Sequence, residues 1–275
     1  MQLPDRDTVT QIIRTVAADE IMARFRNLGE ADIREKNPGD WVTVADLESE
    51  KRLTAAFLEL LPESAVVGEE VAEDNPSILK ALTGPGPVWI IDPVDGTQNF
   101  SKGKDCFAVI VAYLLNGQIR AGWIHDPVSG RTVWAAAGEG AWATDGTGDW
   151  TCITASAPKD FTAMAGSLPY RLRKTFAERQ HRNQPPFPAR VVRMGSVGRE
   201  YMELAQGNLD FALYRFKLKP WDHAAGVLIA EEAGGFAGLA PGSPLSGLGL
   251  GIAEGSLLLA PSADNWRQLV HEFEL

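Results

Sequence analysis

The sequence predicts an α+β protein built from two lobes, residues 1–150 and 151–275, the second of which has α/β character. In the first half, segments with helical periodicity are combined with β-rich apolar runs joined by short turns, a pattern typical of helices packed on a largely antiparallel sheet. In the second half, short apolar runs alternate with helical segments, as in an α/β layer. We therefore place the boundary between the lobes near residue 150.

Two helices are expected in the first half. Residues from about 5 to 27 carry apolar side chains at helical spacing with charged residues between them. Residues from about 44 to 60 follow Thr43, which is a suitable N-cap. One face of this second helix presents Leu53, Phe57 and Leu60.

Apolar runs in the first half predict the strands of a sheet. The run Ala65-Val-Val-Gly68 reads as a short strand, and Val88-Trp-Ile-Ile91 reads as another that ends at Asp92-Pro93. The runs 107–115 and 118–124 are separated by Asn116-Gly117, a strong hairpin signal. A further strand is expected over residues 131–136, so the sheet is largely antiparallel.

The second half is predicted to alternate between helices and strands. A small-residue helix over 222–233 ends at Gly234-Gly235, which suits a helix C-terminus. The Gly-, Pro- and Leu-rich residues 238–251 suggest a loop between strands. The other expected elements are a basic helix over 170–182, a strand over 191–193, a helix over 196–206 and a strand over 209–214.

Composition excludes several classes of protein. No apolar run reaches the roughly 18 residues needed to span a bilayer, and the N-terminal residues do not resemble a secretory signal. The two cysteines, Cys106 and Cys152, cannot form a disulfide framework, so we expect a cytoplasmic protein. The four histidines are far apart, without the spacing of a zinc site.

Charge is distributed unevenly between the halves. Residues 1–150 hold 13 Lys and Arg against 24 Asp and Glu, whereas residues 151–275 hold 13 against 12. The acidic first half predicts neither membrane-surface nor stable nucleic-acid binding, because it repels phosphate backbones. If this region handles a phosphate, cations are needed between the like charges. The alternative is that most of these carboxylates form a solvated surface.

The segment Asp92-Pro-Val-Asp-Gly-Thr97 is the strongest candidate for chemistry. It places two carboxylates three residues apart at the end of a predicted strand, and Gly96 lets the backbone approach a ligand. If Thr97 opens a helix, its free N–H groups suit a phosphate. Oxygen ligands of this kind suit Mg²⁺. Taken alone, the segment could also be only a turn.

Four other acidic positions are candidates with simpler alternatives. Glu69 and Glu70 follow a predicted strand and could be solvated loop residues. The alternative for Asp46 is a purely structural role in which it complements the dipole of its helix. The alternative for Asp222 is a purely structural role as a helix cap. His223 is expected to pack at the helix start.

Taken together, five segments in order resemble the inositol monophosphatase family, within the lithium-sensitive, Mg²⁺-dependent phosphatases. The resemblance covers roughly residues 9 to 260 and is specific for the family, less so for the substrate. It implies a layered αβαβα sandwich of the inositol monophosphatase and fructose-1,6-bisphosphatase type. The segments are Lys36 with Asp40-Trp-Val-Thr-Val-Ala-Asp46, Gly68-Glu-Glu70, Trp89-Ile-Ile-Asp-Pro-Val-Asp-Gly-Thr-Gln-Asn-Phe100, Gly195-Ser-Val-Gly198, and Trp221-Asp222 with Ala-Ala-Gly226.

The resemblance implies a site for two or three Mg²⁺ ions that hydrolyses a small phosphorylated metabolite, such as inositol 1-phosphate, with water as the nucleophile. Catalytic roles fall to Asp46, Glu69 and Thr97, where Thr97 backed by Asp46 orients the water. The metal ligands implied are Glu69, Asp92, the Val94 carbonyl, Asp95 and Asp222. The phosphate and substrate contacts implied are Gly96, Thr97, Ser196, Arg215 and Asp222. A homodimer is also implied.

One departure from the family pattern bears on the substrate. Inositol-cleaving members carry an acidic residue seven positions before the Trp-Asp aspartate, where this chain has Arg215. Residues 171–193 add seven Lys and Arg with only Glu178 acidic. An arginine beside the pocket suits a second phosphate or a carboxylate, although these bases could instead balance the acidic lobe or form a subunit contact.

Other functions therefore stay open. A nucleotide 3′-phosphatase or a histidinol-phosphate phosphatase of the same superfamily is an alternative to an inositol phosphatase. A non-enzymatic alternative is an interaction partner in RNA processing or transcription that keeps the phosphatase fold. The full set of acidic residues at the ligand positions favours the enzyme, because clustered charges are costly for a scaffold to maintain.

Overall fold

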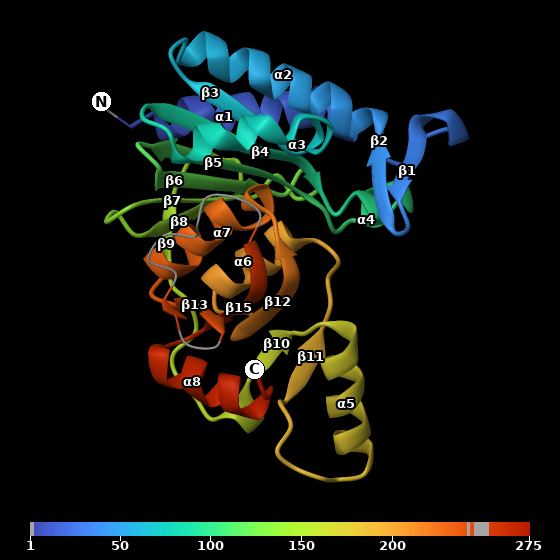
Figure 1. The fold of residues 1–275 in the computed structure, drawn as a ribbon, viewed down its shortest axis with the longest axis vertical. Helices are drawn as coiled ribbons and strands as arrows, with labels where there is room; N and C mark the ends of the chain where they lie inside the picture. Colours follow the sequence, from blue (N-terminus) through green and yellow to red (C-terminus); the bar gives the residue numbers. More distant parts are fainter. Residues whose placement is uncertain (1–2, 241–242, 245–252) are drawn as a thin grey trace.

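Five layers make up the fold in the computed structural model, which describes residues 3–240, 243–244 and 253–275. In Figure 1 they follow one another from top to bottom as helices, sheet, helices, sheet and helices. This order is the αβαβα sandwich that the family resemblance implies. Three hydrophobic clusters fill the spaces between the layers. Within the described residues, no helix is long and apolar enough to cross a membrane.

The outer helical layer consists of α1 (Arg6–Val16) and α2 (Val44–Leu60). The predicted first helix is shorter than expected, since it changes to a π-helix, η1 (Ala17–Met22), and then ends. The N-cap role of Thr43 is confirmed, because its hydroxyl accepts a hydrogen bond from the Ala45 N–H. The predicted apolar face holds for Leu53 and Phe57, which are buried, but Leu60 at the helix end is exposed.

The larger sheet has the order β3-β4-β5-β6-β7-β8-β9, and only the β3–β4 pair is parallel. The predicted hairpin is confirmed, with positive φ at both Asn116 and Gly117, as a tight β-turn of this kind needs. The strands are β3 (Ala65–Gly68), β4 (Pro87–Asp95), β5 (Ala108–Leu115), β6 (Gln118–His125), β7 (Thr132–Ala136), β8 (Ala141–Thr144) and β9 (Thr151–Ile153).

Strand β4 corrects the prediction that the run from Val88 ends at Asp92-Pro93. The strand continues to Asp95, with an irregularity in its pairing to β5 between Asp92 and Asp95. Pro93 has no N–H to donate, so the ladder is interrupted there without ending. The irregularity keeps both aspartates buried at the end of one strand.

The middle layer is the pair α6 (Val197–Ala205) and α7 (Pro220–Glu232), which packs on the inner face of the larger sheet. Close approach is possible because Gly122 of β6 lies directly against Ala225 of α7, where a Cβ would come within 2.9 Å of Ala225 Cα. Helix α7 begins two residues earlier than expected, with Pro220 in its first turn.

The second sheet has the order β11-β10-β12-β15-β13-β14. Its strands are β10 (Ala165–Ser167), β11 (Arg190–Val192), β12 (Phe211–Leu218), β13 (Phe236–Ala240), β14 (Ser243–Pro244) and β15 (Ala253–Ala260). The loop predicted over 238–251 is wrong for residues 238–240, which belong to β13, and falls largely outside the described residues. Strand β12 extends four residues beyond the predicted end at 214.

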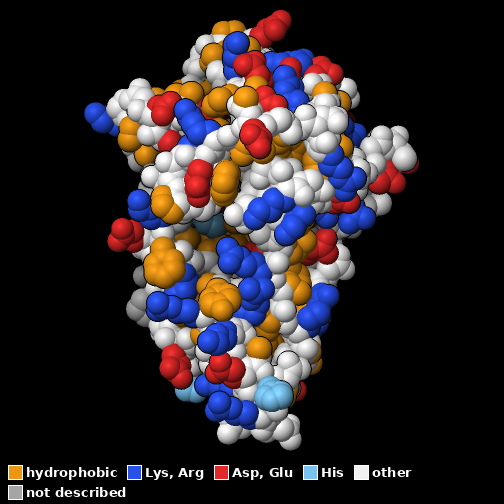
Figure 2. Space-filling model, turned by 90° about the vertical axis from the view of Figure 1, so that its right-hand side faces the viewer, with side chains coloured by type: hydrophobic (Ala, Val, Ile, Leu, Met, Phe, Trp, Pro, Cys, Tyr) orange, Lys and Arg blue, Asp and Glu red, His pale blue; other side chains and the backbone are white. Residues whose placement is uncertain are grey.

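Helices α5 (Tyr170–His181) and α8 (Ala263–Glu272) form the last layer, and the predicted basic helix is thereby confirmed. Lys and Arg side chains gather on the lower part of the face shown in Figure 2. The remaining elements are η2 (Glu30–Asp32), β1 (Ile33–Asn37), β2 (Asp40–Thr43), α3 (Glu69–Asp74), η3 (Pro76–Thr83), α4 (Thr97–Ser101) and η4 (Phe161–Ala163).

Candidate active site

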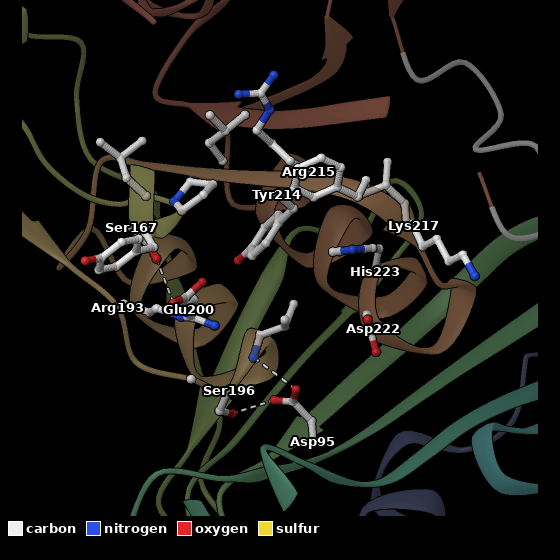
Figure 3. Close-up of a pocket in the computed structure, with 18 residues that line it drawn as sticks. Asp95, Ser167, Arg193, Ser196, Glu200, Tyr214, Arg215, Lys217, Asp222 and His223 are labelled. Atoms are coloured by element: carbon white, nitrogen blue, oxygen red, sulfur yellow. Dashed lines mark hydrogen bonds between the residues drawn. The ribbon is translucent and has the colours of Figure 1, made fainter. Parts of the chain in front are cut away.

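The predicted site residues converge where several elements end. Strands β3 and β4 are parallel, so Glu69, just after β3, and Asp95, the last residue of β4, meet at one edge of the sheet. Asp222 comes from the first turn of α7 in the other half of the chain. Figure 3 shows Asp222 directed toward Asp95 across a pocket. The site is therefore assembled from both halves.

Asp95 is held by the N-terminus of α6. Its carboxylate accepts hydrogen bonds from the Val197 N–H at 3.0 Å and the Gly198 N–H at 2.7 Å, and a short one from the Ser196 hydroxyl (Figure 3). A helix N-terminus stabilises a carboxylate in this position. Burial outweighs these bonds and raises the pKa of Asp95 to about 6. Ser196 therefore contacts a candidate metal ligand, in addition to lining the pocket.

Asp46 and Thr97 form the pair that the resemblance implies. The Thr97 hydroxyl lies 2.9 Å from Asp46 Oδ1 and 2.9 Å from the Val94 carbonyl oxygen, and its single proton can serve one of them at a time. The other oxygen of Asp46 accepts bonds from the hydroxyl and the N–H of Thr43. Asp46 thus has both its helix-capping role and a link to Thr97. Burial raises its pKa to about 7.

Glu69 is engaged by a lysine that sequence reasoning did not single out. Lys219 Nζ lies 3.0 Å from Glu69 Oε1 and 2.7 Å from Glu73 Oε1. Lys36 pairs with the neighbouring Glu70 at 3.1 Å and also with Glu73. Two lysines therefore bind the three glutamates, and the alternative that Glu69 and Glu70 are simply solvated is wrong. The sequence signal that could have indicated this contact is the position of Lys219, three residues before the candidate metal ligand Asp222.

Asp92 and Asp222 complete the acidic cluster. Asp92 is buried and accepts a hydrogen bond from the Val94 N–H. Within the described part of the chain, the Asp222 carboxylate accepts no hydrogen bond and α7 has no side-chain cap, so the helix-cap alternative for Asp222 is wrong. Burial, and then the charges of Glu69 and other acidic residues, raise the pKa values of Asp92 and Asp222 well above the ordinary value.

The donor set fits a hard cation. Every group offered is an oxygen, and the carboxylates raise one another's pKa values, a repulsion that a bound cation relieves. Among the described residues, no three Asp, Glu, His or Cys side chains already converge as a finished ligand set. Instead, Lys219 binds Glu69 and the N-terminus of α6 binds Asp95.

Gly96 permits the sharp turn between β4 and α4. Its φ is +91°, and a Cβ here would lie 3.0 Å from Ser196 Cβ and 3.1 Å from the carbonyl oxygens of Cys106 and Gly195. The prediction that Thr97 opens a helix is confirmed, since the first N–H bonded inside α4 is that of Asn99, to the Gly96 carbonyl. Only glycine suits both the backbone conformation and the space.

A pocket of about 500 Å³ opens beside the cluster. Among the predicted residues it is lined by Asp95, Ser196, Arg215 and Asp222, whereas the other four side chains of the set, Asp46, Glu69, Asp92 and Thr97, are not part of its wall. Sequence reasoning did not assign Tyr214, Glu200 or His223 to this wall. His223 is buried as expected, with Nδ1 3.1 Å from the Tyr201 hydroxyl.

Comparison with known proteins agrees with this geometry. The model of the inositol monophosphatase family matches residues 5–271. The inositol-1-monophosphatase of Mycobacterium leprae is 34% identical over 271 residues, which is 92% of each chain. A relative from Pseudomonas aeruginosa, named Nus factor SuhB, is 29% identical over 223 residues, 80% of this chain and 79% of that one.

Solved structures share the fold. An IMPase from Thermotoga maritima superposes with a TM-score of 0.78 at 24% identity, covering 97% of this chain and 96% of that one. At this identity the likeness supports the fold, while the family match rests on the sequence. The chain belongs to the inositol monophosphatase family and is a phosphoric monoester hydrolase.

Proposed function

We propose that this enzyme hydrolyses a small phosphate monoester, of the size of inositol 1-phosphate, in a reaction that depends on two or three Mg²⁺ ions. The observation that supports this most is the meeting of Glu69, Asp92, Asp95 and Asp222 from both halves of the chain beside a pocket of about 500 Å³. Keeping so many carboxylates together is unfavourable unless cations bind between them.

Glu69, Asp92, Asp95, Asp222 and the Val94 carbonyl would hold the ions. When bound, Mg²⁺ neutralises the phosphoryl group and makes water more acidic. If the Thr97 hydroxyl donates its hydrogen bond to Asp46, the Val94 carbonyl oxygen is left free to serve as a metal ligand. To hold an ion, Glu69 would have to lose its contact with Lys219, whose flexible side chain can move away.

The protein's own groups would position the reactants. When Thr97 Oγ1 donates a hydrogen bond to Asp46 Oδ1, the lone pairs of Oγ1 remain able to accept a hydrogen bond from the attacking water and so orient it. The N–H groups of Gly96 and Thr97 at the start of α4 would face the phosphate oxygens. Ser196, Arg215 and Asp222 line the pocket and would contact the rest of the substrate. Phosphoryl transfer depends mainly on such positioning and electrostatics.

Several finer properties belong to the same proposal. The resemblance supports a homodimer and inhibition by lithium, and free thiols at Cys106 and Cys152 suit a cytoplasmic protein. The substrate itself is a small phosphorylated metabolite.

Phosphate release from inositol 1-phosphate tests the reaction, measured with Mg²⁺ and after its removal by EDTA. Thr97→Val and Thr97→Ser form a matched pair, since valine keeps the shape and serine keeps the hydroxyl. We expect Thr97→Val to lower kcat by roughly a hundredfold or more and Thr97→Ser to retain most of it. Equal loss in both variants would show that the hydroxyl does not act in the reaction.

A second function is favoured by the relative named Nus factor SuhB. A protein can serve both as a phosphatase and as a partner in transcription or RNA processing. Capture of partners by a tagged, inactive variant from its own cells tests this. Transcription proteins retained by wild type and variant alike would establish the second function, and their absence from both would remove it.

A further inference from the structure

The pocket has walls of opposite charge. Asp95 and Asp222 line it where the predicted metal ligands meet, Arg215 and Lys217 line it from β12, and Arg193 and Glu200 lie beside each other in its wall. In Figure 3, Asp95 lies at the lower end of the pocket, while Arg215 and Lys217 project from the upper strand, β12. The acidic side is suited to metal ions. The basic side can bind an anion directly.

The three cations are available for a ligand. All three are exposed, and within residues 3–240, 243–244 and 253–275 none has a carboxylate within ion-pair distance. Their situation differs from that of Lys36 and Lys219, which are fully engaged by glutamates. Arg215 lies near the ring of Phe216, whose centroid is 6.0 Å from the guanidinium carbon, and the charge of Arg193 acts on the carboxylate of Glu200. An unpaired cation beside a reaction site attracts anionic substrates.

Strand β12 is distorted where it forms this wall. Phe216 has a φ of +80°, a rare conformation for a bulky residue, and its side chain is 75% exposed. The burial pattern loses its alternation, so that Arg215, Phe216 and Lys217 are all exposed and all line the pocket. Across the ladder stands Gly255, which leaves space beside the distortion. Backbone strain of this kind is concentrated at functional sites.

Aromatic rings accompany the cations. Besides Phe216, the pocket is lined by Tyr170, which is 60% exposed at the start of α5. Exposed hydrophobic side chains lie among basic ones at mid-height in Figure 2. Flat apolar surfaces next to cations suit a planar ring that carries negative charge.

We propose that this pocket selects phosphate esters that carry a second anionic group and a planar ring, with Arg215 and Lys217 binding the anion and Phe216 covering the ring. This rests on the proposed function, since the scissile phosphate must sit at the acidic side. The same wall opposes a substrate that carries an ammonium group, such as histidinol phosphate, because the cations repel it. It also offers little to a neutral polyol.

Four phosphate esters test the proposal as two matched pairs. Adenosine 3′,5′-bisphosphate is compared with adenosine 3′-monophosphate, and fructose 1,6-bisphosphate with fructose 1-phosphate, by kcat/KM for phosphate release. We expect each bisphosphate to exceed its monophosphate by roughly tenfold, the scale of one charge-assisted hydrogen bond. That ratio should fall toward one in Arg215→Gln and Lys217→Gln and with added salt. The control Lys174→Gln, on the exposed face of α5, should keep the wild-type ratio.

The ring contact has its own variant. Phe216→Leu keeps apolar bulk but removes the flat face, so it should lower kcat/KM for the adenosine compounds more than for the fructose compounds. The second-anion site is overturned if the ratio of kcat/KM for a bisphosphate to that for its monophosphate is near one in the wild type. It is also overturned if Arg215→Gln leaves this ratio unchanged. Equal losses for both families of compound in Phe216→Leu overturn the ring contact.

Failure of the proposed function gives a different result. If none of the four compounds releases phosphate with Mg²⁺, their binding to the same proteins can be measured by calorimetry, because they are not consumed. Tighter binding of adenosine 3′,5′-bisphosphate than of the monophosphate, lost in Arg215→Gln, would still establish the subsite. Equal binding of the two would overturn it.

Discussion

At the scale of single residues, the site shows charged groups held by partners that the sequence alone does not reveal. Asp95 is bound by backbone N–H groups of a helix that starts about 100 residues later in the chain. Glu69 is bound by Lys219, across a separation of 150 residues. The motifs predicted which acidic side chains gather. Their hydrogen-bond partners depend on the tertiary structure.

Lys219 competes with metal ions for Glu69. It contacts Glu69 and Glu73 at 3.0 and 2.7 Å, so its ammonium occupies part of the acidic environment. We expect Lys219→Met to bind Mg²⁺ more tightly by a factor of about five, or about 1 kcal/mol, in isothermal titration calorimetry. Lys51→Met, at an exposed position on α2, serves as the control. Weaker Mg²⁺ binding in Lys219→Met would mean that the lysine supports the site.

His125 makes stability depend on pH. Burial and the charge of Arg14 lower its pKa from 6.5 to about 4, so it stays neutral in the folded protein while the unfolded chain takes up a proton below pH 6.5. Its contribution is fully present above pH 6.5 and falls as the pH drops toward 4. By pH 5 the loss in the free energy of unfolding is about 2 kcal/mol.

Urea denaturation at several pH values measures this loss. The side chain of His125 contacts the Thr132 hydroxyl at 3.0 Å, and His125→Gln can keep a similar contact without titrating. The difference in stability between wild type and variant should therefore shrink as the pH falls from about 7 to 5. A constant difference would show that His125 has the same pKa in the folded protein as in the unfolded chain.

At the scale of elements, the N-terminus of α6 depends on a glycine for its approach to β4 and β5. A Cβ on Gly198 would lie 2.9 Å from Ala108 Cβ and 3.1 Å from Asp95 Oδ2. We expect Gly198→Ala to push the helix away from Asp95 and to lower the free energy of unfolding by about 1–3 kcal/mol. Gly84→Ala is the control, because its φ of −79° suits alanine and its neighbours are at least 3.4 Å away. Similar urea midpoints for the two variants would contradict this view of α6.

Most elements were predictable because local signals and packing agree. The Asn116-Gly117 hairpin and the Thr43 cap follow from turn and capping chemistry that acts over a few residues. The end of β4 was misjudged because Pro93 usually ends a ladder, whereas here pairing resumes at Asp95. The conformation of Phe216 has no local sequence signal, since it runs against the preference of a bulky residue.

At the scale of the whole molecule, one hydrophobic core crosses the predicted boundary at residue 150. The cluster between the sheets includes Ile124 and Val133 from the first half together with Tyr201 and Ala225 from the second. Glu232 at the end of α7 also accepts hydrogen bonds from N–H groups of the first half, those of Gly138 and Gly140. We propose that residues 1–150 and 151–275 are two lobes that share one core and that they are not independent domains.

Expression of the two halves apart tests this shared core. Each half would expose the apolar surface that the other covers, so we expect neither fragment to unfold cooperatively on heating. Mixing the fragments should restore a cooperative transition followed by circular dichroism. Cooperative unfolding of either fragment alone would establish independent domains.

The most direct test of a metal centre built from both halves is Mg²⁺ binding to wild type and Asp222→Asn, measured by calorimetry. Asp222 accepts no hydrogen bond among the described residues, so asparagine removes charge without breaking one, and the melting temperature of the metal-free protein should not fall. We predict that wild type binds Mg²⁺ and that Asp222→Asn loses at least roughly tenfold in affinity together with phosphatase activity. An unchanged Mg²⁺ isotherm in Asp222→Asn would contradict the metal centre proposed here.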